Sequence, residues 1–99
     1  MNEINSDDLQ AAVARLHTCK PTLIQSVPIK ETFEGSTVWE GVVHVFDLKG
    51  HLHANRAYAW SSPIEGSEKR RIFAVLHQGP VTSPVEAVRA AIVAEQRGH

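Results

Sequence analysis

Turn-forming residues cut the middle of this 99-residue chain into short segments, and their spacing limits the folds open to it. Glycine and proline mark turns because glycine accepts a positive φ and proline fixes its own φ. Links this short join antiparallel neighbours, whereas parallel strands need a crossover of about a dozen residues or more. The sequence therefore predicts an antiparallel meander. Its strands are expected at residues 22–33, 37–48, 54–61 and 69–77.

Two of these segments differ from an ordinary half-buried strand. Pro28 interrupts 22–33, and because proline cannot donate to a strand ladder, this segment is either an edge strand or broken in two. The sheet is therefore expected to have three or four strands. Segment 37–48 is apolar at both odd and even positions, a pattern that predicts burial on both of its faces.

A helix is expected at each end of the chain. Residues 7–19 repeat apolar side chains at the spacing of one helical face, and Ser6 or Asp7 can cap that helix. Residues 83–86, with the sequence SPVE, match a capping box, in which serine accepts from a helical amide and glutamate reaches back. This motif predicts a second helix over 84–97.

The predicted fold class is α+β, an antiparallel meander flanked by an N-terminal and a C-terminal helix in the order α-β-β-β-β-α. A chain of this length forms one domain, residues 1–99, because a second core would not fit. Residues 1–6 are expected to be a loose N-terminal tail.

Hairpin register decides which side chains share a face of the sheet. We place Trp60 opposite Arg71 and Tyr58 opposite Phe73, which separates a smooth aliphatic surface from an aromatic one. Both helices are expected on the smooth surface, because small side chains allow close approach. We call it the alanine face; its members are Val38, Val42, Phe46, Ala57, Ala59, Ile72, Ala74 and Leu76.

The opposite surface, the aromatic face, gathers the large side chains and is the predicted binding surface. Three strands present there a patch of roughly 300 Å², near the upper range for a monomer, so something should cover it. We considered three covers: the first helix or segment 22–33, a second copy of the chain, or a ligand, peptide or nucleic acid. The face comprises Trp39, Val43, Val45, Tyr58, Trp60, Phe73 and Val75, edged by Arg56 and Arg71.

Composition and charge argue against several classes of protein. Hydrophobic residues make up 42% of the chain and charged residues 21%, as in globular domains and unlike disordered chains. A net charge of −1 lacks the cationic excess of a duplex-binding protein. Cys19 is the only cysteine, so no internal disulfide forms and a reducing compartment is favoured. With no apolar run near ~20 residues and no signal-peptide pattern, we expect a cytoplasmic protein outside the membrane.

Signals for chemistry are weak. His51 and His53 lie beside a turn, with His44 and His77 in neighbouring segments, but the spacing fixes no third metal ligand. We therefore expect solvated histidines and neither a metal nor a cofactor. Cys19 ends a predicted helix, where the helix dipole disfavours a thiolate, and no motif for a nucleophile and its base accompanies it.

The sequence thus favours a small non-enzymatic interaction protein, a homodimer that uses the aromatic face, with a protein or peptide partner as a further possibility. The first alternative is a single-stranded nucleic-acid-binding module on the same face, since aromatic rings beside arginines can stack bases. The second alternative is a small enzyme or histidine-based metal protein.

Overall fold

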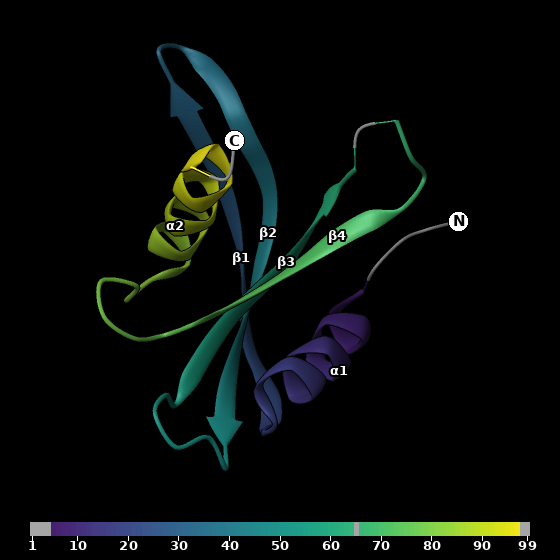
Figure 1. Cartoon of the computed structure of the whole chain (residues 1–99), viewed down its shortest axis with the longest axis vertical. Coiled ribbons are helices and arrows are strands. Elements are labelled where there is room, and N and C mark those ends of the chain that lie inside the picture. Colours follow the sequence, from purple (N-terminus) through teal and green to yellow (C-terminus); the bar gives the residue numbers. More distant parts are fainter. Residues whose placement is uncertain (1–4, 65, 98–99) are drawn as a thin grey trace.

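The computed structural model describes residues 5–64 and 66–97 and confirms the predicted α+β class. Four strands form one antiparallel sheet in the order β1-β2-β3-β4, with a helix before and after them (Figure 1). The elements are α1 (Ser6–His17), β1 (Lys20–Phe33), β2 (Ser36–Lys49), β3 (Arg56–Pro63), β4 (Arg70–Leu76) and α2 (Pro84–Arg97).

The first helix begins earlier than predicted because Asn5 caps it. The Asn5 side chain accepts a hydrogen bond from the Asp8 amide at 3.0 Å, and the Asp8 carboxylate accepts from the Asn5 amide at 3.1 Å. Asn5 and Ser6, which were expected in a loose tail, therefore belong to the helix start. Residues 1–4 lie outside the described residues.

The predicted capping motif starts α2, with one difference. The Ser83 hydroxyl accepts from the Glu86 amide at 3.2 Å, as expected. The Glu86 carboxylate reaches one residue further back and accepts from both the amide and the hydroxyl of Thr82. The bond from that hydroxyl lowers the pKa of Glu86. Helix 84–97 is thus confirmed. Its first turn is held by both Thr82 and Ser83 instead of by Ser83 alone.

Of the two alternatives for the segment that contains Pro28, the edge strand is correct. β1 is continuous, and Pro28 pairs with Val42 of β2. Two bulges interrupt the ladder, with Ile24 as the extra residue on β1 and Val38 as the extra residue on β2. A two-residue turn with positive φ at Glu34 and Gly35 closes the hairpin.

The sheet forks in its middle. β2 and β3 pair only between His44–Asp47 and Arg56–Ala59, whereas the β1–β2 and β3–β4 ladders continue well beyond those pairs. The two hairpins then separate (Figure 1). The prediction that the whole of 37–48 is buried is therefore wrong for its first half: Val38 and Val42 are 49% and 45% exposed.

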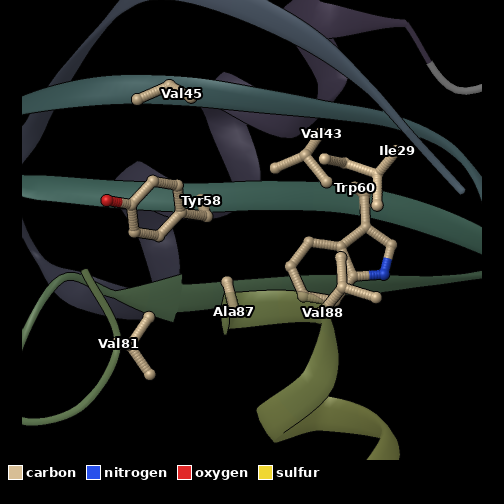
Figure 2. Close-up of a cluster of buried hydrophobic side chains, with 8 residues drawn as sticks. All are labelled: Ile29, Val43, Val45, Tyr58, Trp60, Val81, Ala87 and Val88. Atoms are coloured by element: carbon tan, nitrogen blue, oxygen red, sulfur yellow. The ribbon is translucent and has the colours of Figure 1, made fainter. Parts of the chain in front are cut away.

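The helices cover opposite faces of the sheet, which corrects the prediction that both pack on the alanine face. Leu9 and Val13 of α1 pack with Phe46, Ala57 and Ala59 on that face. α2 packs on the aromatic face instead (Figures 1 and 2). The aromatic face carries too much apolar surface to stay open, and the short link after the edge strand β4 lets α2 fold onto it.

Candidate interaction surface

Four of the nine residues predicted as an interface are already buried within the chain. Val43, Val45, Tyr58 and Trp60 each expose 2% or less of their surface. Figure 2 shows them beside Ala87 and Val88 of α2, with Ile29 of β1 at their side. One of the three covers considered, the first helix, is excluded, because α1 lies on the opposite face of the sheet. Of the remaining five predicted residues, Arg71 is exposed and four are half-buried: Trp39, Arg56, Phe73 and Val75.

The register between β3 and β4 is shifted by two residues from the predicted one. Trp60 pairs with Phe73 instead of Arg71, and Tyr58 pairs with Val75. Because side chains alternate between faces with a period of two, such a shift keeps each of these residues on its predicted face. The aromatic face therefore has its predicted members on these two strands, although their cross-strand neighbours differ.

Three aromatic rings and one guanidinium group form a row across the aromatic face. Trp39 and Trp60 meet edge to face with ring centroids 6.0 Å apart, and Trp60 stacks on Phe73 at 5.2 Å. The guanidinium carbon of Arg71 lies 5.0 Å from the centroid of Phe73. The row links β2, β3 and β4, and it crosses the fork where the backbone ladder is missing.

One side-chain hydrogen bond crosses the fork, and others lie at its side. The Trp39 indole nitrogen donates to the Ser62 hydroxyl at 2.8 Å. Arg70 reaches from β4 to the side of β3 that faces the fork, donating to the hydroxyl and the carbonyl of Ser61 at 2.9 and 3.1 Å. Trp39 and Trp60 were predicted on the same face, but the roles of both serines were not, because the fork was not predicted.

A groove of about 580 Å³ lies between the aromatic row and α2. Val88, Ala91 and Ile92 of α2 form one wall, and the aromatic row forms the other. Val38 lies on the rim, although it was predicted on the alanine face; its position in a bulge breaks the alternation of side chains. The groove is mainly apolar, which suits a binding surface more than a site of polar chemistry.

The single tyrosine of the chain, Tyr58, has a hydroxyl that is satisfied internally. Its oxygen lies 2.6 Å from Nδ1 of His77. Burial raises the pKa of Tyr58, Arg56 opposes that effect, and the charge of Glu86 adds to it. The phenol is therefore held neutral in the core, as expected for a buried hydroxyl with one hydrogen-bond partner.

The rings of His17, His51 and His53 lie near one another, with centroids of successive rings 6.2 and 6.3 Å apart. Within residues 5–64 and 66–97, no three His, Cys, Asp or Glu side chains are arranged to hold a metal ion. His51 Nδ1 accepts hydrogen bonds from two backbone amides of its own loop, at 3.0 and 3.1 Å. Burial lowers the pKa of His44 and raises the pKa of Cys19, which disfavours a reactive thiolate.

The edge strand β4 is incompletely covered on both faces. Every residue from Ile72 to Leu76 is half-buried, whereas Ala57 to Trp60 on the neighbouring β3 are fully buried. The backbone of β4 is also open on its outer side. Because the His77 amide donates to β3, residues 71, 73 and 75 face β3, and residues 70, 72, 74 and 76 face outward.

One side chain reaches this outer row of backbone groups. Nε2 of His17 lies 3.2 Å from the Ala74 carbonyl and donates to it, since a carbonyl only accepts. In the part of the chain that the structure describes, no other hydrogen bond to the outward groups of Ile72, Ala74 and Leu76 is found.

The opposite edge of the sheet is protected. β1 contains Pro21 and Pro28, which have no amide hydrogen to donate, and a bulge at Ile24 interrupts its regular geometry. An ion pair between Glu31 of β1 and Arg89 of α2 further ties this edge to the helix. The two edges of the sheet thus differ in their capacity to accept another strand.

Neither helix in the described chain has the length and apolarity to cross a membrane. Comparisons with protein-family models, curated proteins and solved structures found no match to this chain.

Proposed function

We propose that this chain is a small non-enzymatic interaction protein that associates with a second copy of itself through the part of the aromatic face that α2 leaves uncovered. The incomplete burial of Phe73 and Val75 on β4, directly beside the fully buried residues of β3, carries this proposal. An interface over β4 would complete the burial of side chains that α2 covers only in part.

The polar groups near this surface support binding more than catalysis. The hydroxyls of Ser62 and Tyr58 are engaged with Trp39 and His77, respectively. Ser61 is likewise held by Arg70. A nucleophile or general base must reach its substrate, and these groups instead hold the strands and the core together.

The single-strand nucleic-acid alternative receives less support. Stacking proteins present exposed rings to successive bases. Here Trp60 is 2% exposed and lies between Trp39 and Phe73, so the central ring of the row offers no free surface to a base.

Sedimentation velocity from low to high micromolar concentration tests the proposal. We expect a dimer whose mass is insensitive to salt, because apolar association does not weaken as salt rises, whereas phosphate binding does. Val75→Lys should give a folded monomer. Ile24→Lys is the matched control, since Ile24 is an exposed aliphatic residue on the opposite edge strand, and it should leave the dimer intact.

Two results would overturn the proposal. One is a parent protein that stays monomeric at high micromolar concentration. The other is a Val75→Lys variant that remains dimeric while Ile24→Lys becomes monomeric, which would move the interface to β1. Circular dichroism checks that each variant folds, and Val75→Thr, a milder change at the same position, replaces Val75→Lys if the lysine unfolds the chain.

A further inference from the structure

We infer that the two copies join β4 to β4, antiparallel about a two-fold axis, so that the two four-stranded sheets become one sheet of eight strands. The inference rests on the proposed self-association and specifies its geometry. It begins from the contrast between the edges: β1 is interrupted by prolines and bulged, whereas β4 has no proline and only apolar residues from Ile72 to Leu76. An open apolar edge of this kind is a template for another strand.

The backbone of β4 selects a register. A two-fold axis at Phe73 lets all seven residues of the strand overlap with their copies, and it places outward-facing residues opposite one another. Ile72 then faces the partner's Ala74, and Arg70 faces the partner's Leu76. The Ala74 carbonyl that His17 contacts has a second lone pair for the partner's Ile72 amide.

The same register matches the side chains. Phe73 lies opposite the partner's Phe73 in a non-hydrogen-bonded pair, the closer of the two pair types, with Cα atoms about 4.5 Å apart. The aromatic row of Trp39, Trp60 and Phe73 would therefore continue across the axis into the row of the partner. On the alanine face, the small side chain of Ala74 leaves space for the partner's Ile72.

The charges of the strand are compatible with this pairing. The basic run 69–71 lies at one end of β4, so antiparallel pairing keeps the centres of the two runs, at Arg70, roughly 20 Å apart and limits their repulsion. Arg71 is instead brought beside the partner's Val75.

Disulfide trapping tests this register. Arg71→Cys and Val75→Cys are made separately in a Cys19→Ser background, which removes the one native cysteine. In the proposed register, position 71 of one copy opposes position 75 of the other at a distance that a disulfide spans. Like positions lie about 14 Å apart, which is too far. Mild oxidation should therefore link the mixture of the two variants and neither variant alone.

Each result has a distinct meaning. Cross-linking in the mixture alone supports the inference. A dimer that shows no cross-link in the mixture, or that links either variant by itself, overturns the register and leaves the proposed self-association standing. A monomeric parent removes both proposals.

Amide hydrogen exchange of the unmodified protein gives a second readout that needs no substitution. The outward amides of Ile72, Ala74 and Leu76 should exchange fast in dilute protein and become protected as the dimer forms. The inward amides of Phe73 and Val75 serve as controls, since they bond to β3 and should be protected at both concentrations. Outward amides that exchange equally fast in the dimer would contradict strand pairing.

Discussion

The indole nitrogen of Trp39 donates a hydrogen bond to the Ser62 hydroxyl at 2.8 Å, and this bond joins the two hairpins where β2 and β3 no longer pair. The indole ring also lies over Gly41 on its own strand. A Cβ at Gly41 would come within 2.8 Å of the ring, which is closer than van der Waals contact allows. One tryptophan thus depends on a serine across the fork and on a glycine beneath its ring.

Removing the serine hydroxyl should weaken the fork. Ser62→Ala leaves the Trp39 N–H without its acceptor, and we expect a loss of about 1 kcal/mol in the free energy of unfolding. Urea denaturation followed by circular dichroism measures this change. Ser36→Ala is the control, because Ser36 is an exposed residue at the tip of the other hairpin, and it should have little effect. Equal stability of parent and Ser62→Ala would show that the bond contributes nothing.

Adding a methyl group at Gly41 should displace the indole. Gly41→Ala forces the Trp39 ring away from its position and so breaks the bond to Ser62. The clearest signature is coupling in a double-mutant cycle: once Gly41 is alanine, Ser62→Ala should have almost no further effect on stability. A red shift of tryptophan emission should accompany the single change. Additive effects of the two substitutions would show that Trp39 keeps its place.

The features that the sequence predicted well are those set by local chemistry. Helix 84–97 follows from its capping residues, and the separation of aromatic from alanine side chains follows from the period of two in a strand. The register of the last hairpin was wrong by two residues because the long loop after β3 does not fix which residues pair. Because the error was an even number of residues, Phe73 nevertheless stayed on its predicted face, beside the other rings.

The features that the sequence did not predict depend on the whole sheet. Which face α2 covers is decided by the total apolar area to be buried, which no single motif reports. The fork arises where β2 and β3 diverge, so the contact between Trp39 and Ser62 could not be inferred from either strand. The groove has the same origin, since the bulge at Val38 turns that side chain to its rim.

The alanine face should reject a larger side chain. Ala59 is fully buried and lies in the cluster that includes Leu9 and Val13 of α1. Ala59→Leu should therefore destabilise the fold by roughly 1–3 kcal/mol through overpacking. Ala90→Leu is the matched control, because Ala90 is exposed on α2 and has room for the same change. Thermal denaturation compares the two variants; equal melting temperatures would mean that α1 does not press on Ala59.

The last prediction concerns Tyr58 at alkaline pH. Its pKa in the folded chain is raised by burial above the ordinary value of 10.0, so folding favours the neutral phenol. A raised folded pKa contributes stability that is complete below pH 10.0 and is lost as the pH rises through the folded value. Stability should therefore decline above pH 10.0.

Because Tyr58 is the only tyrosine, the ultraviolet absorbance of its phenolate reports this one group. The midpoint should lie above 10.0 in the native protein and return to about the ordinary value in denaturant. Tyr58→Phe is the control: it loses the bond to His77, and its stability deficit against the parent should shrink as the pH rises above 10.0. A native midpoint at the ordinary value would show that the Tyr58 hydroxyl is open to water.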